Sequence, residues 1–103
     1  AYGYNVATMR YEVVLSPEAV EDLRGLRANV RAEVRDALER HLRSEPTRVT
    51  RSRIKRLRGL SRPQYRLRVG EIRVYYDVEG AEVHVLAIIE KQDAAEWLRK
   101  VGR

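Results

Sequence analysis

The fold is decided by residues 65–78, which read Y-R-L-R-V-G-E-I-R-V-Y-Y-D-V. Apolar and basic residues alternate before Gly70 and again just after it, and a period of two is typical of strands with one buried face. Gly70-Glu71 supplies a short turn, so the stretch is predicted to be a β-hairpin. Arg66 and Arg68 are therefore expected on one sheet face, with the apolar residues beside them on the other.

A strand and two helices are predicted before this hairpin. Residues 10–15, R-Y-E-V-V-L, combine aromatic and β-branched residues and are predicted to form a strand. Ser16 and Pro17 match the N-cap and the first position of a helix. A second helix, ended by Pro46, completes a helical hairpin. Its apolar stripe has a spacing of four and consists of Val30, Val34, Leu38 and Leu42.

The pattern after the hairpin predicts a further strand and a last helix. Residues 82–89 are apolar enough for a central strand, and residues 93–101 form a short helix that carries Trp97 and Leu98. The predicted order is β-α-α-β-β-β-α. The fold class is α+β: an antiparallel β-sheet meander with an N-terminal strand, a helical hairpin packed on one face and a short C-terminal helix.

The 103 residues suit one domain. We expect it to span residues 9–103, because the strand-like pattern starts just after Met9; the uncharged residues 1–8 are interpreted as an N-terminal extension or a cloning remnant.

The absence of Cys excludes disulfides and thiolate metal sites, and two histidines are too few for a multi-His zinc site. No metal or cofactor is expected. No apolar run approaches the ~20 residues of a membrane span, so a soluble, cytoplasmic domain is predicted.

Positive charge is concentrated in residues 47–73. This block holds ten basic residues and one acidic residue, Glu71, whereas the whole chain has a formal charge of +6. A basic block anchored by apolar residues is a candidate polyanion-binding surface, and the alternative is a solvated face that only aids solubility. The residues of the block before the hairpin that are predicted to bind RNA are Arg51, Arg53, Lys55, Arg56, Arg58 and Arg62.

The hairpin itself carries the candidate chemistry. If the register of the turn places Arg73 on the face of Arg66 and Arg68, three guanidinium groups converge. Preorganised cations stabilise the charge that develops in phosphoryl transfer, and they can equally bind RNA phosphates without any reaction. The sequence has no nucleotide-cradling glycine motif and no candidate Ser-His-Asp set.

Residues 56–78, R-L-R-G-L-S-R-P-Q-Y-R-L-R-V-G-E-I-R-V-Y-Y-D-V, resemble the RelE/ParE toxin superfamily of bacterial toxin–antitoxin systems. The hallmark is a basic-Leu-x-Gly motif followed by a Y-R-L-R-x-G-type hairpin after two helices, and the likeness extends over about residues 9–98. The resemblance implies a RelE-like, metal-independent endoribonuclease that cleaves mRNA on the ribosome through attack of the 2′-OH, leaving a 2′,3′-cyclic phosphate. The catalytic positions that it implies are Arg66, Arg68, Arg73 and Lys91.

Two features depart from the family's pattern. Trp97 stands where many ribonuclease members have a tyrosine, and an indole can stack on an RNA base or on the sheet but cannot abstract a proton. Arginine replaces lysine on the first hairpin strand, and a guanidinium is a poor general base. Either catalysis rests on electrostatics, or another group acts as acid and base. The groups nearby in sequence are Tyr75, Tyr76, Glu90 and Asp93.

Three functions therefore stay open. The first is the mRNA-cleaving toxin, whose partners are the ribosome and mRNA. The second is a ParE-like toxin that poisons DNA gyrase without cleaving RNA, and the third is a non-toxic RNA-binding relic. Either toxin implies a cognate antitoxin, RelB-like or of another kind, with an acidic segment that lies along a sheet edge or helix groove and masks the arginines.

Overall fold

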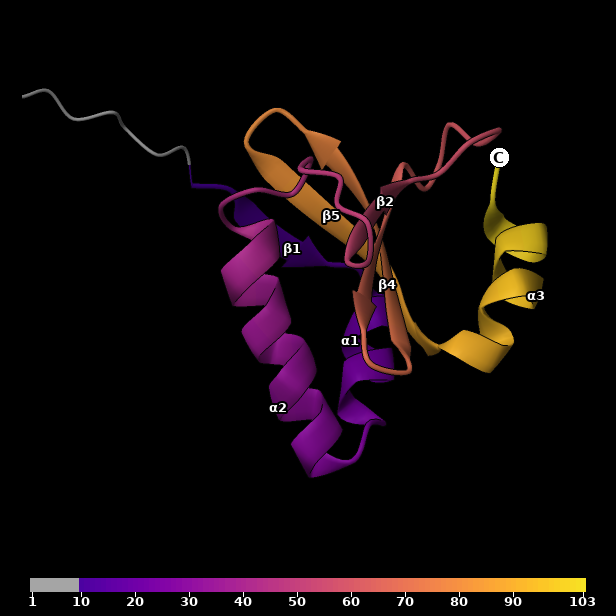
Figure 1. Cartoon of the computed structure of the whole chain (residues 1–103). Coiled ribbons are helices and arrows are strands. Elements are labelled where there is room, and N and C mark those ends of the chain that lie inside the picture. The colour runs from indigo at the N-terminus through magenta and orange to yellow at the C-terminus, as the bar shows by residue number, and fades with distance from the viewer. Residues whose placement is uncertain (1–9) are drawn as a thin grey trace, which may run out of the picture.

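The computed structural model describes residues 10–103, so the extension expected at residues 1–8 and the start at Met9 lie outside the described residues. One five-stranded sheet has two helices on one face and one helix on the other (Figure 1). The elements in chain order are β1 (Glu12–Leu15), α1 (Pro17–Arg24), α2 (Ala28–Ala37), the π-helical turn η1 (Leu38–Leu42), β2 (Ile54–Arg56), β3 (Tyr65–Val69), β4 (Ile72–Glu79), β5 (Glu82–Glu90) and α3 (Lys91–Val101).

The strand order is β1-β5-β4-β3-β2, with β2 to β5 antiparallel and β1 parallel to β5. The predicted α+β class is confirmed, whereas the prediction of a purely antiparallel sheet is wrong for β1. The helical hairpin carries the chain from β1 at one edge to β2 at the other. Three antiparallel reversals then bring β5 alongside β1 in the same direction. The short strand β2 was not predicted, because three residues are too few to show an alternating pattern.

The core lies between the sheet and the helical hairpin. Val34 and Leu42, from the predicted apolar stripe, are fully buried against the apolar face of the sheet. Leu67 and Val74 face each other across β3 and β4 in this core. Tyr76 is buried there too, and its hydroxyl donates a 2.6 Å hydrogen bond to the carbonyl of Pro46, which fixes the chain just after the helices.

Beyond the end of β1, side chains of α1 and its N-cap form hydrogen bonds with the backbone of β5. Ser16 acts as the predicted N-cap, since its Oγ accepts a 3.0 Å hydrogen bond from the Ala19 N–H. The same hydroxyl donates to the carbonyl of Leu86 at 3.1 Å. Leu86 is the extra residue of a β-bulge, where the pairing with β4 shifts register. Further along, the carboxylate of Asp22 accepts from the Ile88 N–H at 3.0 Å, so α1 satisfies polar groups that β1 does not reach.

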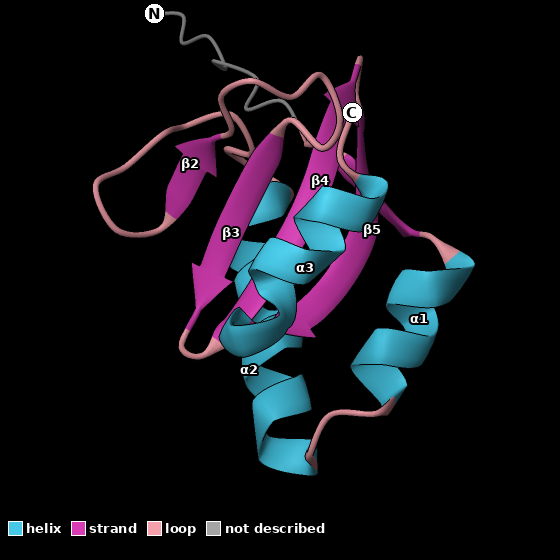
Figure 2. Cartoon of the chain, turned by 90° about the vertical axis from the view of Figure 1, so that its right-hand side faces the viewer, coloured by secondary structure: helices cyan, strands magenta, loops and turns pink. Residues whose placement is uncertain are grey.

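Helix α3 crosses the opposite face of the sheet, over β4 and β5 (Figure 2). It starts at Lys91, two residues before the predicted start, and none of its residues is fully buried. Its end is joined to the loop before β3, because the Arg103 carbonyl accepts from the Ser61 N–H at 2.7 Å and the Arg103 N–H donates to the backbone carbonyl of Arg62 at 2.9 Å. Across residues 10–103, every helix is too short or too polar to cross a membrane.

The double role of Ser16 predicts a measurable loss on substitution. Ser16→Ala removes the cap of α1 and a hydrogen bond to the bulge, so we expect the free energy of unfolding to fall by about 1–2 kcal/mol in urea denaturation. Ser44→Ala is the matched control, because the Ser44 hydroxyl donates an exposed hydrogen bond to the carbonyl of Arg40 within η1. It should change stability by less than about 0.5 kcal/mol. Equal losses in the two variants would contradict this role of Ser16.

Candidate nucleic-acid interface

The register of β3 and β4 brings the basic hairpin residues together on the α3 side of the sheet. Arg68 is paired with Arg73, and Arg66 is paired with Tyr75. Directly paired residues share a face, so the three arginines lie side by side, as expected if the turn register matched. Lys55 pairs with Arg66 from the other side and extends the group. We call Lys55, Arg66, Arg68 and Arg73 the arginine face.

The four cations differ in exposure. Lys55 and Arg68 are exposed, and Arg66 is half-buried. Arg73 is only 6% exposed, and its Nη1 donates to the carbonyls of Gly70 at 2.8 Å and Ile72 at 3.1 Å. The β3–β4 turn therefore holds the Arg73 guanidinium in one orientation, while Arg68 opens to solvent beside a hollow that Arg53 also lines.

No carboxylate neutralises the arginine face within residues 10–103, because none of the ion pairs found there includes any of its four residues. The Nε atom of Arg66 is buried without a hydrogen-bond partner. Burial, followed by repulsion from Arg73 and Arg68, lowers the pKa of Arg66. Like charges directly opposite each other destabilise a sheet. This arrangement is unfavourable for the isolated fold and favourable for binding an anion.

Tyr75 lies in the middle of this group, and the sequence indicated it only as one of four nearby groups that could act as acid and base. It is 2% exposed, and burial raises the pKa of its phenol, while the guanidinium groups of Arg66 and Arg73 act in the opposite direction. The Trp97 indole stacks on the Tyr75 ring with centroids 5.0 Å apart. Trp97 thus packs on the sheet, which was one of its two expected roles, and only its other face is free for an RNA base. The sequence feature that places Tyr75 on this face is its position two residues after Arg73 on the same strand, because alternate residues of a strand share a face.

Lys91 lies at the same end of the sheet as Arg73. Its backbone N–H donates to the Glu71 carbonyl at 2.8 Å, next to the glycine that holds Arg73, and its side chain is exposed beside Glu71 and Glu90. The three arginines of the predicted catalytic set therefore share one face, and Lys91 lies next to the turn at the end of β3 and β4. Within the described part of the chain, no group of three His, Cys, Asp or Glu side chains is placed to hold a metal ion.

The remaining predicted RNA-binding residues are dispersed. Arg56 lies on the opposite face, where its guanidinium covers the Tyr65 ring at 5.2 Å. Arg62 donates through Nε to the buried carboxylate of Asp77 at 2.9 Å, so it serves partly to fix the loop before β3. Arg51 and Arg58 are exposed in loops. The basic block is therefore one compact face surrounded by separate cations.

Comparison with known proteins points to one family. The family model of the ParE toxin of the type II toxin–antitoxin system, parDE, matches residues 13–95. The RelBE2 toxin–antitoxin complex from Mycobacterium tuberculosis contains a similar chain, with 26% identity, a TM-score of 0.70, and coverage of 82% of this chain and 94% of that one. For the archaeal RelE-RelB complex from Pyrococcus horikoshii OT3, the identity is 27%, the TM-score 0.59, and the coverage 81% and 97%.

A chain of the RelB-RelE complex from Methanococcus jannaschii has the same fold, with 18% identity, a TM-score of 0.62, and coverage of 82% of this chain and 96% of that one. Comparison with curated protein sequences finds no match.

The unpaired charge of Arg66 predicts that its removal stabilises the fold. Arg66→Met keeps the packing of the stem and removes the desolvated cation, so we expect the free energy of unfolding to rise by about 0.5–1 kcal/mol. Arg62→Met is the contrasting variant: it leaves the Asp77 carboxylate, 3% exposed, without its ion-pair partner, and we expect a loss of about 1–3 kcal/mol. Urea denaturation at neutral pH measures both. A clear loss of stability in Arg66→Met would assign that side chain to the fold instead.

Proposed function

For this chain, which belongs to the ParE toxin family of type II toxin–antitoxin systems, we propose from its arginine face that it acts on RNA as a ribosome-dependent mRNA endoribonuclease. The observation that carries the proposal is that three guanidinium groups from two neighbouring strands share one face and have no acidic partner in residues 10–103. Arginine forks bind phosphate oxygens in two-point contacts. The negative charge of a phosphodiester would compensate the positive charge of such a cluster.

The proposed reaction needs no cofactor. The 2′-oxygen of the substrate forms a bond to the adjacent phosphorus, the bond from phosphorus to the 5′-oxygen breaks, and the products are a 2′,3′-cyclic phosphate and a 5′-hydroxyl. The 2′-OH proton passes to solvent, and the leaving oxygen takes up a proton. Arg68 and Arg66 stabilise the additional negative charge on the phosphate oxygens, and Arg73 does so in a fixed orientation. Catalysis therefore rests mainly on electrostatic stabilisation.

Substrate access depends on α3. Tyr75 and Arg73 are buried on the face that α3 crosses, and Trp97 lies over the Tyr75 ring. No residue of α3 is fully buried, and elements with little buried surface open at the lowest free-energy cost. We therefore expect Arg68 and Lys55 to bind the RNA backbone first, and Arg73 to reach the phosphate once α3 shifts from the sheet.

The same burial favours a second candidate function. With Arg73 and Tyr75 covered, the exposed part of the arginine face is suited to docking on a protein or on DNA without cleavage. A ParE-like activity, in which the toxin traps DNA gyrase on cleaved DNA, needs no catalytic group of its own. Trp97 in place of a tyrosine is consistent with this alternative, since an indole supplies no proton acceptor.

A partner follows from either activity. The similar chain from Mycobacterium tuberculosis is a component of a toxin–antitoxin complex, and the one from Pyrococcus horikoshii is a component of a RelE-RelB complex. We propose that this chain likewise forms a complex with a cognate antitoxin, which masks the basic surface until growth arrest is required, and that the free toxin acts in the cytoplasm.

The decisive test is in-vitro translation with purified protein, followed by mapping of the RNA ends. We expect cleavage within codons only when ribosomes are present, and a loss of about 100-fold in cleavage rate for Arg68→Ala, which removes an exposed cation from the face. Arg68 is preferred to Arg73, because Arg73 also holds the turn and its loss threatens folding. Arg24→Ala is the matched control, since Arg24 is exposed on α1 in a surface pair with Glu21.

Two results would contradict the proposed ribonuclease activity. One is intact RNA in arrested translation or arrested cells. The other is Arg68→Ala with the cleavage rate of the wild type. Accumulation of gyrase–DNA cleavage complexes in cells that contain intact mRNA would establish the second candidate in its place.

A further inference from the structure

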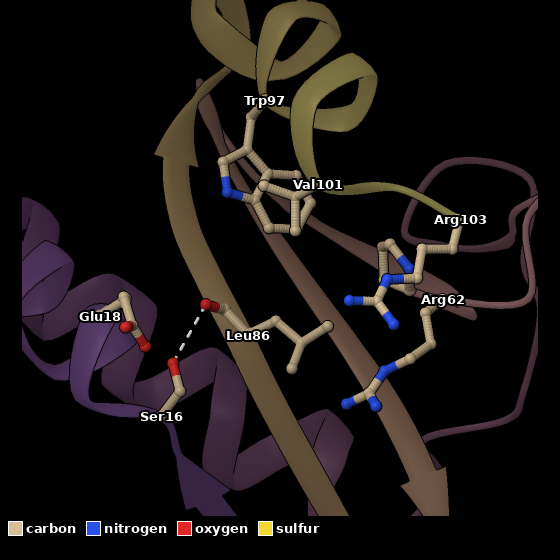
Figure 3. A pocket seen from close by; sticks show the side chains of 8 residues that line it. Ser16, Glu18, Arg62, Leu86, Trp97, Val101 and Arg103 are labelled. Carbon is tan, nitrogen blue, oxygen red and sulfur yellow. Dashed lines mark hydrogen bonds between the residues drawn. The ribbon is translucent and has the colours of Figure 1, made fainter.

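A groove of about 450 Å³ lies on the α3 side of the sheet, between α3 and the start of α1 (Figure 3). Its apolar wall comes from three separate parts of the chain: Leu86 at the bulge of β5, Pro63 in the loop before β3, and Trp97 and Val101 on α3. Val101 is 45% exposed, although it belongs to the same face of α3 as Trp97. An apolar side chain exposed in a hollow gains from burial by a partner.

The ends of this groove carry opposite charges. Arg62 and Arg103 lie at one end, and Ser16 and Glu18 lie at the other (Figure 3). The contact of Arg62 with Asp77 is made through Nε, and no hydrogen bond found among residues 10–103 uses the terminal nitrogens of Arg62. Of the ion pairs among residues 10–103, none includes the Arg103 side chain. Two guanidinium groups are thus available next to an apolar wall.

We propose that this α1–α3 groove binds an amphipathic segment of the antitoxin, in which an apolar side chain is followed by an acidic one. The apolar side chain packs against Leu86, Trp97 and Val101. The carboxylate is bound by Arg62 and Arg103, as a guanidinium fork binds a carboxylate. This inference rests on the proposed function only in that it requires the chain to have an antitoxin.

Charge favours a peptide over RNA in this groove. RNA carries a negative charge at every phosphate, so a strand that follows the groove from Arg62 meets the carboxylate of Glu18. A peptide can place an acid at one end and a hydrogen-bond donor or a base at the other. The arginine face, where no acid interrupts the cations, is the surface suited to a phosphate backbone.

Occupation of the groove has a mechanical consequence. A segment that touches both Leu86 on the sheet and Val101 on α3 holds this helix against the sheet. The stack of Trp97 on Tyr75 is then retained, and Arg73 keeps the buried position that it has in this structure. The antitoxin segment would therefore inhibit the toxin at a distance from the arginine face, in addition to any direct masking of the arginines.

Trp97 makes the groove directly observable, because it is the only tryptophan of the chain. We expect purified cognate antitoxin to change the Trp97 emission of the full-length toxin in a saturable titration. Val101→Glu and Arg103→Glu should each weaken the affinity by at least about tenfold, because they place a carboxylate where the apolar and acidic side chains bind. Ala95→Glu is the matched control: it adds the same charge to an exposed position of α3 outside the groove, and it should leave the affinity within about twofold.

The outcomes separate this inference from the proposed function. If the toxin arrests growth and binds antitoxin, but Val101→Glu and Arg103→Glu bind as tightly as Ala95→Glu, the groove is not the docking site and the toxin activity stands. If a short oligouridylate competes with antitoxin for the wild type, and Val101→Glu and Arg103→Glu weaken its binding while Arg68→Ala does not, the groove is an RNA site and the inference is overturned. A toxin that neither arrests growth nor binds antitoxin would contradict both proposals.

Discussion

The structure depends on the pairing of β3 with β4. In the observed register, Leu67 faces Val74 in the core and Arg68 faces Arg73 on the other side. A slip of one residue would exchange the two faces, burying guanidinium groups under the helical hairpin and exposing the apolar side chains. The turn sets the register, since Gly70 has a φ of +58°, a conformation that side-chain-bearing residues adopt at a cost. One turn therefore determines both the core and the arginine face.

This pairing also explains why a small domain tolerates, on two neighbouring strands, three arginines that form no ion pair with any part of the chain that the structure describes. The opposing face supplies the stabilisation, through fully buried side chains on β3 to β5 packed under α1 and α2. On the arginine face, the turn carbonyls accept from Arg73, and the Tyr75 and Trp97 rings cover part of the group. Arg66 has no such compensation at its buried Nε atom. The buried, unpaired charge of Arg66 therefore destabilises the fold locally, and an anionic ligand bound at the arginine face would remove this destabilisation.

Much of the fold was predictable, because the deciding signals are local. The alternation in the hairpin, the cap at Ser16 and the four-residue spacing of the second helix each depend on neighbours in sequence, and each is confirmed. The direction of β1 was not predictable, since it depends on where the helical hairpin returns the chain. The burial of Arg73 and the ion pair of Arg62 with Asp77 were missed for a similar reason: both result from segments that meet only in three dimensions. The sequence therefore predicted more RNA-binding residues than the structure brings together on the arginine face.

Helix α3 connects the two surfaces that the proposals concern. Trp97 contributes to both, since its ring stacks on Tyr75 above the arginine face and also lines the α1–α3 groove. The C-terminal end of α3 is joined to the loop before β3 by the backbone hydrogen bonds of Arg103. The same loop contributes Arg62 to the groove, and the bond of Arg62 to Asp77 holds the loop in place. If α3 moves from the sheet, as the proposed function expects for access to Arg73, the groove is dismantled at the same time. Under the two proposals, one position of α3 forms the groove and another exposes Arg73. A ligand of the groove and a phosphate at Arg73 would then oppose each other thermodynamically, even though they need share no atom of the protein.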